Sequence, residues 1–154
     1  MFRDFLAEVI AITGNSRFRG AGSLDLGHHS LGPMNANACT LLREVAAREE
    51  ISLSVRGACM EPFLTQGNVV RVRTKRAYWP GDVLVFRSRA GDLLAHRLLG
   101  WRPAGLVTKG DDCAVHDAPV RRAQIIGAAA VPVRLRERLR AMAAFAAIAW
   151  RRVW

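Results

Sequence analysis

The chain has 154 residues, of which 51% are hydrophobic and 23% are charged, and this composition excludes an intrinsically disordered chain. Its length fits one domain with a hydrophobic core. The odd number of cysteines, three, argues against a disulfide framework and fits a reducing compartment. The net charge of +10 comes from arginine, since Lys75 and Lys109 are the only lysines, and it predicts an arginine-rich, solvated surface.

Residues 1–50 are predicted to form two helices and a linker. In residues 1–12, apolar side chains recur at helical spacing with charges between them, which is typical of an amphipathic helix and not of a cleavable signal peptide. Residues 13–35 are rich in Gly, Ser and Asn and are predicted to be a loop. A second helix is expected over residues 38–50, with Asn37 as its N-cap. Its apolar stripe would consist of Leu41, Leu42, Val45 and Ala46.

Residues 51–133 change to an alternation of period two, which predicts a β-domain. Turn sequences such as W-P-G-D, R-A-G-D and K-G-D-D separate the apolar runs. The fold class is therefore expected to be mainly β, built of short strands and flanked by helices. The six predicted strands cover residues 51–55, 68–73, 82–87, 92–99, 105–109 and 124–133.

Residues 134–154 are predicted to form a basic amphipathic helix. Its uninterrupted apolar run covers ten residues, 141–150, and a membrane-spanning helix needs about 20. Two arrangements remain open, a helix lying on an anionic membrane surface and a helix packed on the β-domain. We expect a cytoplasmic or peripheral membrane protein, because neither a cleavable signal peptide nor a full transmembrane helix is seen. The apolar face of the helix would consist of Leu135, Leu139, Met142, Ala146, Ala149 and Val153.

Four blocks of sequence place chemically reactive residues in a recognisable order. They are C-M-E-P-F-L-T-Q-G-N-V-V-R-V from Cys59, Y-W-P-G-D-V-L-V-F from Tyr78, L-L-A-H-R-L-L-G from Leu93 and T-K-G-D-D-C-A-V-H-D from Thr108. In order and spacing they resemble the signal peptidase I-like superfamily, which also contains the self-cleaving domains of SOS repressors. The nearest resemblance is to the archaeal and endoplasmic-reticulum signal peptidases, which use a histidine base. It covers residues 55–127, about half of the chain, and implies a signal peptidase-like β-domain.

The resemblance implies roles for four titratable residues. Cys59 falls on the nucleophile, where the family has serine, and His96 falls on the general base. Asp111 and Asp117 fall on the family's two aspartates. A carboxylate on the far ring nitrogen of a histidine fixes its tautomer and stabilises the imidazolium. We expect only one of the two aspartates to contact His96, because two carboxylates on one imidazole would repel each other.

The resemblance also implies how the loop around the nucleophile is shaped. Gly57 stands where the family often has a serine whose hydroxyl helps to bind the oxyanion. Met60 and Pro62 would shape the loop and a substrate pocket. We expect no transmembrane anchor of the kind typical of signal peptidases, since no apolar run of the needed length is seen in this sequence.

The combined pattern predicts a peptidase that hydrolyses a peptide bond through an acyl-enzyme on Cys59, with His96 as base. A neighbouring imidazolium favours the thiolate form of a cysteine, so the pair is chemically sensible. The expected partner is a peptide or protein substrate in protein or peptide maturation, and no cofactor is expected. The alternative is a catalytically silent peptide-binding pseudoenzyme of the same fold. A self-cleaving regulator would need a DNA-binding domain, and residues 1–50 show no convincing helix-turn-helix, so nucleic acid is not an expected partner.

Two other arrangements of the same side chains stay open. Cys113 and His116 have the C-x-x-H spacing of zinc ligands, and Cys59 and His96 could complete a set of four. Zinc ligands normally come as two such short spacings, and residues 59 and 96 are far apart in sequence, so no metal is expected. Cys59 and Cys113 could also form a redox pair.

Overall fold

The computed structural model describes residues 11–13 and 34–150 of the chain. Residues 1–10, which make up most of the predicted first helix, lie outside the described residues. Most of the predicted loop, residues 14–33, and the end of the predicted C-terminal helix, residues 151–154, also lie outside them.

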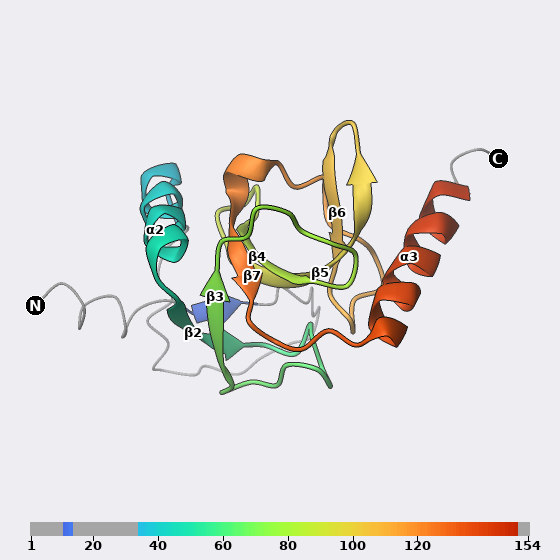
Figure 1. Cartoon of the computed structure of the whole chain (residues 1–154), viewed down its shortest axis with the longest axis horizontal. Coiled ribbons are helices and arrows are strands. Elements are labelled where there is room, and N and C mark those ends of the chain that lie inside the picture. The colour runs from blue at the N-terminus through green and yellow to red at the C-terminus, as the bar shows by residue number, and fades with distance from the viewer. Residues whose placement is uncertain (1–10, 14–33, 151–154) are drawn as a thin grey trace, which may run out of the picture.

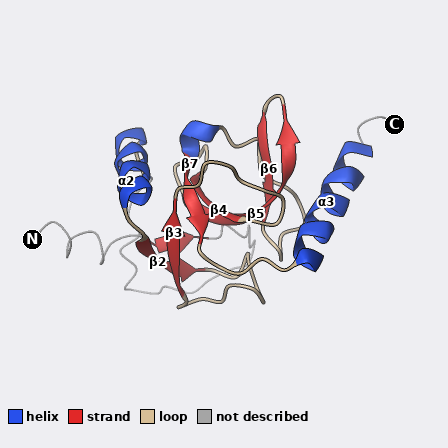
Figure 2. Ribbon diagram, in the orientation of Figure 1, coloured by secondary structure: helices blue, strands red, loops and turns tan. Residues whose placement is uncertain are grey.

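Seven strands form one curved sheet in the order β1-β2-β3-β7-β4-β5-β6, with one helix beside each end of the fold (Figures 1 and 2). The strands β2 to β6 follow one another along the chain, and β7 inserts between β3 and β4. Every neighbouring pair is antiparallel except β1 and β2. The bounds are Ala11–Thr13 (β1), Ile51–Arg56 (β2), Val69–Arg73 (β3), Val83–Arg87 (β4), Leu93–Arg102 (β5), Gly105–Lys109 (β6) and Ile125–Ala129 (β7).

The mainly β class and all six predicted strands are confirmed. One prediction is wrong at the N-terminal side, because Ala11–Thr13 were assigned to the end of a helix and the start of a loop. They form the short strand β1, which pairs in parallel with residues 54–56 of β2. The backbone edge of β2 supplies hydrogen-bonding partners that a helical pattern in the sequence cannot reveal.

The two faces of the central strands are both buried. On β4, Val83 and Val85 pack into one apolar cluster with β2, β3 and α2, while Leu84 and Phe86 pack into a second cluster with Leu98 of β5. The alternation of period two therefore separates two cores and does not separate core from solvent. This arrangement holds β5, and the histidine that it carries, rigidly inside the fold.

The helix α2 (Ala36–Arg48) packs on β7 and β3. Its N-cap is Asn35 and not the predicted Asn37, because the side chain of Asn35 accepts a hydrogen bond of 2.8 Å from the N–H of Ala38. The predicted apolar stripe is also partly wrong, since Leu41 is exposed. The buried stripe, spaced by three and four residues, consists of Cys39, Leu42 and Ala46.

The helix α3 (Leu135–Trp150) packs on β5, but not through its predicted apolar face. Ala141 is buried, and Phe145 and Ile148 pack with it against Leu99 and Val107. Gly100 makes room for this contact, because a Cβ there would lie 2.7 Å from the ring of Phe145.

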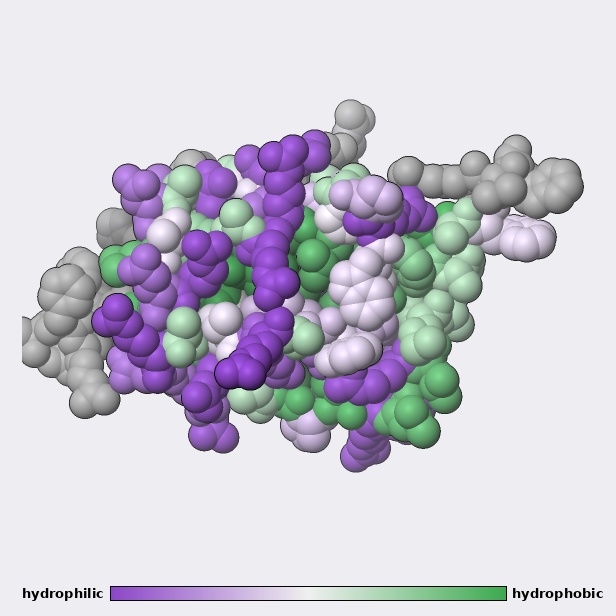
Figure 3. All heavy atoms as spheres, turned by 45° about the horizontal axis from the view of Figure 1, so that its top comes forward, coloured by the Kyte–Doolittle hydropathy of each residue, from purple (hydrophilic) through white to green (hydrophobic). Residues whose placement is uncertain are grey.

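The opposite side of α3 is an exposed apolar stripe, formed by three described residues of the predicted face and by Trp150, which the prediction did not include. Between 53% and 72% of each of its four large side chains is exposed: Leu135, Leu139, Met142 and Trp150. Hydrophobic and neutral residues gather over α3, while hydrophilic residues cover much of the rest of the view (Figure 3). Among the described residues, no helix is long and apolar enough to cross a membrane.

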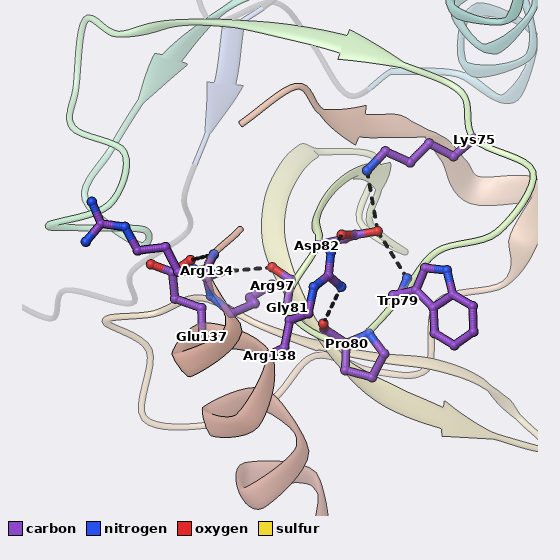
Figure 4. A network of polar contacts seen from close by, with 9 residues as sticks. All are labelled: Lys75, Trp79, Pro80, Gly81, Asp82, Arg97, Arg134, Glu137 and Arg138. Atoms are coloured by element: carbon purple, nitrogen blue, oxygen red, sulfur yellow. Dashed lines mark hydrogen bonds and ion pairs between the residues drawn. The ribbon is translucent and has the colours of Figure 1, made fainter. Parts of the chain in front are cut away.

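A buried carboxylate ties α3 to the sheet (Figure 4). Asp82 is 2% exposed and accepts a hydrogen bond from Arg138 of α3 at 3.2 Å. Lys75 lies 3.5 Å from the same carboxylate, and the N–H of Trp79 donates to it at 3.1 Å. Arg138 also donates to the carbonyl of Pro80 at 2.9 Å. A buried charge needs such partners, so this network fixes the start of α3 beside the turn that precedes β4.

Candidate active site

The loop that carries Cys59 begins where β2 ends. Gly57 has a φ of +86°, a conformation that glycine adopts without strain, and it turns the chain away from β2. The N–H of Glu61 donates to the carbonyl of Ala58 at 2.9 Å, which closes a tight turn around Cys59. The loop is anchored by Met60, which is 1% exposed and belongs to the core.

The loop residues singled out in the sequence thus take separate positions. Met60 shapes the loop from the core side, whereas Pro62 is exposed and lines a cleft. Cys59 is half-buried, and its backbone N–H makes no hydrogen bond within the described part of the chain. That N–H is therefore available to an oxyanion, while Gly57 has no side-chain donor to add.

His96 lies on β5 and is held from one side by a carboxylate. Its Nδ1 lies 2.7 Å from Oδ2 of Asp117, and the hydroxyl of Thr108 donates to the same oxygen at 2.7 Å. Because an ionised carboxylate can only accept, Nδ1 carries the proton of this hydrogen bond. The N–H of Asp117 also donates to the carbonyl of Thr108 at 2.8 Å, so the loop after β6 is pinned where the carboxylate meets the ring.

The other ring nitrogen of His96 points at the nucleophile loop. Nε2 is buried and is without a hydrogen-bond partner among the described residues. Gly110 lies beside it, since a Cβ at that position would be 3.2 Å from Nε2 and 2.6 Å from the carbonyl oxygen of Cys59. The missing side chain of Gly110 therefore lets the Cys59 loop approach the imidazole. Before substrate binds, the hydrogen bond between a catalytic base and its nucleophile is often long or poorly aligned, and it tightens in the substrate complex.

The pKa of His96 is raised from its ordinary value of 6.5 to about 9. Burial lowers the pKa of this imidazole, but the hydrogen bond and charge of Asp117 and the interaction with the Cys59 side chain raise it more. At neutral pH His96 is therefore an imidazolium. A positive charge beside Cys59 is the partner that a thiolate requires.

Asp111, the second predicted aspartate, does not contact His96. Its two carboxylate oxygens accept hydrogen bonds from Arg97 at 2.8 and 2.6 Å. Arg97 also donates to the carbonyl of Gly81 at 2.9 Å and lies over the ring of Phe63, 4.6 Å from its centroid. The prediction that one aspartate alone contacts His96 is confirmed for Asp117. Asp111 instead holds the loop after β6 against the Cys59 loop through Arg97.

Three residues of this arrangement were missed in the sequence, although each stands in one of the four blocks. Arg97 directly follows His96, and successive residues of a strand point to opposite faces. Thr108 and Gly110 belong to the block that ends with Asp117. The sequence of this block indicates a turn. The roles of Thr108 and Gly110 depend on how closely the loop after β6 approaches the Cys59 loop, which the sequence does not show.

A cleft of about 530 Å³ lies beside the site, between the Cys59 loop and α3. Its lining includes Glu61, Pro62 and Phe63 of the Cys59 loop and Arg136 and Arg140 of α3. Cys59 and His96 are not part of its lining, but Gly110, which contacts both, is.

The Cys113 and His116 pair of the zinc alternative lies in the segment that follows β6. His116 points its Nδ1 at the carbonyl of Asp117, 2.8 Å away. Within residues 11–13 and 34–150, no group of three or more His, Cys, Asp or Glu side chains is arranged to hold a metal ion.

Comparisons of the chain with family models, with curated proteins and with solved structures gave no match.

Proposed function

We propose that this protein is a signal peptidase I-like peptidase that cleaves a peptide bond through an acyl-enzyme on Cys59. The observation that carries the proposal is the position of His96, which is fixed by Asp117 at Nδ1. Its buried Nε2 faces the Cys59 loop and has no hydrogen-bond partner among the residues that the structure describes. A base held by a third group and directed at a nucleophile is the geometry that acyl transfer requires.

The reaction follows from the charges at the site. The Cys59 sulfur attacks the carbonyl carbon of the scissile peptide bond, and the N–H of Cys59 donates to the oxyanion that forms. His96 gives its Nε2 proton to the leaving amine, which departs and leaves a thioester on Cys59. Neutral His96 then takes a proton from water, which attacks the thioester, and the sulfur leaves as the acid product forms.

Asp117 and Thr108 are positioning residues in this scheme. Asp117 keeps the proton on Nδ1 and stabilises the imidazolium, and the Thr108 hydroxyl orients the carboxylate by a hydrogen bond of 2.7 Å. Arg97 and Asp111 hold the two loops together and do not touch the reacting atoms.

The test is cleavage of a fluorogenic peptide with the sequence Ala-x-Ala before the scissile bond, between about pH 6 and about pH 9. We expect the wild-type protein to cleave it and Cys59→Ala to be inactive. His96→Ala should lower kcat by about 10²–10⁴-fold, the usual contribution of general acid–base catalysis. Cys39→Ala is the matched control, because Cys39 lies on the buried face of α2, outside the site, and should be dispensable for cleavage.

The alternative, a silent peptide-binding pseudoenzyme, makes a different prediction for Cys59→Ser. A site adapted to sulfur loses activity with serine. A hydroxyl needs stronger help from the base, and Gly57 provides no side-chain donor to the oxyanion. A degenerate serine peptidase would gain activity. Cleavage by the serine variant alone would therefore reject the enzyme proposal and establish a silenced site.

We further propose that α3 places the protein on an anionic membrane surface. The exposed stripe of Leu135, Leu139, Met142 and Trp150 offers the apolar contact, and Arg136 and Arg140 offer positive charge beside it.

Flotation with vesicles of anionic and of neutral lipid tests the membrane proposal. Binding should require the anionic lipid, weaken with salt and fall in the double variant Leu135→Ser/Leu139→Ser. Leu41→Ser, which replaces an exposed leucine of α2, is the matched control and should bind normally. Equal binding to neutral vesicles, or equal loss in both variants, would reject the surface.

A further inference from the structure

Two of the three free thiols lie at the candidate active site and the third does not. Cys39 lies on the buried face of α2, where its sulfur lies 3.6 Å from the carbonyl oxygen of Gln124. Cys59 and Cys113 are both half-buried. Cys113 belongs to the turn after β6, in which its N–H donates to the carbonyl of Gly110 at 3.1 Å.

The backbone brings Cys113 against the nucleophile loop. The N–H of Asp112, the residue before Cys113, donates to the carbonyl of Cys59 at 3.0 Å. This hydrogen bond shows that the two chain segments carrying the cysteines are in direct contact, and a disulfide requires neighbouring backbones.

Gly110 marks the space that the two cysteines share. A Cβ on Gly110 would lie 2.6 Å from the sulfur of Cys113, 2.6 Å from the carbonyl oxygen of Cys59 and 3.2 Å from Nε2 of His96. The Cys113 sulfur therefore reaches the same small volume as the imidazole that faces the nucleophile. Burial first, and next the negative charge of Cys59, raise the pKa of Cys113, which is a second sign that the two sulfurs interact.

We propose that Cys59 is a site of reversible oxidation by peroxides and that Cys113 resolves it as a Cys59–Cys113 disulfide. The formation of the disulfide does not require that the protein is a peptidase. Its consequence for activity rests on the proposed function, since the disulfide would occupy the nucleophile.

The chemistry consists of two balanced steps. The Cys59 thiolate attacks one oxygen of hydrogen peroxide, the O–O bond breaks, and sulfenic acid and hydroxide form, so that sulfur loses two electrons and peroxide gains them. The Cys113 sulfur then attacks the Cys59 sulfur, the S–O bond breaks, and the departing hydroxide takes the thiol proton of Cys113 as water. A dithiol reductant reverses the result by thiol–disulfide exchange, and both cysteines return as thiols.

The different surroundings of the cysteines explain the division of roles. The Cys59 loop faces the His96 imidazolium, and a cysteine attacks peroxide as its thiolate, the form that a neighbouring positive charge stabilises. Cys113 has a raised pKa and stays a thiol at neutral pH, so it is the slower of the two to meet peroxide. A resolving thiol close to the first one stops oxidation before the irreversible sulfinic acid forms.

The test uses the full chain, hydrogen peroxide as the oxidant and mass spectrometry of the non-reduced protein. The intact mass should fall by two hydrogens, the titre of free thiols should fall from three to one, and a tryptic digest should contain Cys59 linked to Cys113. Dithiothreitol should restore all three thiols. A linkage to Cys39, a linkage between two chains, or a Cys59 oxidised without any linkage would overturn the proposal.

Variants give an independent readout that does not depend on peptide cleavage. Cys113→Ala and Cys113→Ser, each checked for folding by circular dichroism, should accumulate sulfinic acid on Cys59 under conditions in which the wild type forms the disulfide. Cys39→Ala should form the disulfide as the wild type does. Equal sulfinic acid in wild type and both Cys113 variants would overturn the resolving role.

The activity assay separates this proposal from the peptidase proposal. If the disulfide forms in a protein that cleaves no peptide, the redox inference holds and the peptidase proposal fails. If peptide cleavage is present but peroxide yields no disulfide, the peptidase proposal holds and the redox inference fails.

Discussion

Replacing Asp117 with asparagine should remove a pH dependence of stability that His96 gives the fold. The carboxylate of Asp117 is the main group that raises the pKa of His96 against the opposing effect of burial. Asparagine keeps the size of the side chain and an oxygen that can accept from Nδ1, but it has no charge. The His96 imidazolium would then be buried without its counter-charge, and its pKa should fall well below about 9.

The magnitude follows from the difference between the folded and unfolded pKa of His96, about 9 and 6.5. This difference corresponds to about 3 kcal/mol of free energy of unfolding, because each tenfold change in proton affinity is worth about 1.4 kcal/mol. The folded pKa is the higher one, so the stabilisation is fully present below about pH 6.5. It declines as the pH rises and is lost once the pH passes about 9, because His96 then loses its proton in the folded state as well.

Urea unfolding of the wild type and of Asp117→Asn measures this effect. The wild type should lose about 3 kcal/mol between about pH 6 and about pH 9, and the variant should lose much less. The difference between the two proteins should thus be largest at the acid end. Asp111→Asn is the matched control, because it removes a carboxylate that pairs with Arg97 and not with His96. Its loss of stability should stay nearly constant over the same range.

Two results would refute this reasoning. One is a stability difference between wild type and Asp117→Asn that does not change with pH, which would mean that Asp117 acts only as a neutral hydrogen-bonding group. The other is an NMR titration of His96 in the wild type that shows an ordinary midpoint near its value of 6.5.

Three further predictions concern the neighbours of the site. Iodoacetamide at neutral pH should alkylate Cys59 faster than the other two cysteines, whose pKa values are raised by burial; peptide mapping that finds equal rates would contradict the assigned environment. Gly110→Ala should destabilise the fold by about 1–3 kcal/mol in urea unfolding, since its Cβ would lie 2.6 Å from two atoms, and a neutral effect would refute the close approach. Arg138→Ala should cost about 1–3 kcal/mol by leaving the buried Asp82 carboxylate with fewer partners, whereas Arg140→Ala should be nearly neutral; equal effects would contradict the network.

Most of the strands could be predicted from the sequence because the turn sequences T-Q-G-N, W-P-G-D, R-A-G-D and K-G-D-D separate their apolar runs. The alternation of β3 is a plain signal, with Val70 and Val72 buried between exposed neighbours. The strands β4 and β5 are buried on both faces, so their bounds came from the turns and not from a polar face. The pairing of β1 with β2 could not be foreseen, because a three-residue strand depends on the free edge that it meets.

Only part of the candidate site could be predicted from the order and spacing of the four sequence blocks. The order of the four blocks predicts that Cys59 and His96 meet, but it does not decide between Asp111 and Asp117. That choice depends on the path of the chain after β6. The Thr108 hydroxyl donates a hydrogen bond to the Asp117 carboxylate beside the His96 ring, whereas the Asp111 carboxylate pairs with Arg97.

The sequence of α3 alone also does not decide which face of the helix packs on the sheet, because that depends on the residues of β5 that the helix meets. Its two apolar stripes are similar in the sequence. The stripe with Phe145 packs because Gly100 leaves space for the ring, and the stripe with Leu139 stays exposed.

Trapping the acyl-enzyme tests the central claim most directly. The wild-type protein would be mixed with an Ala-x-Ala peptide ester, quenched in acid after a short time and analysed by intact mass and peptide mapping. We predict an added mass equal to the acyl part of the peptide, attached to Cys59 as a thioester, absent from Cys59→Ala and present in Cys39→Ala. Cleavage without any adduct on Cys59, or an adduct that persists in Cys59→Ala, would contradict the account.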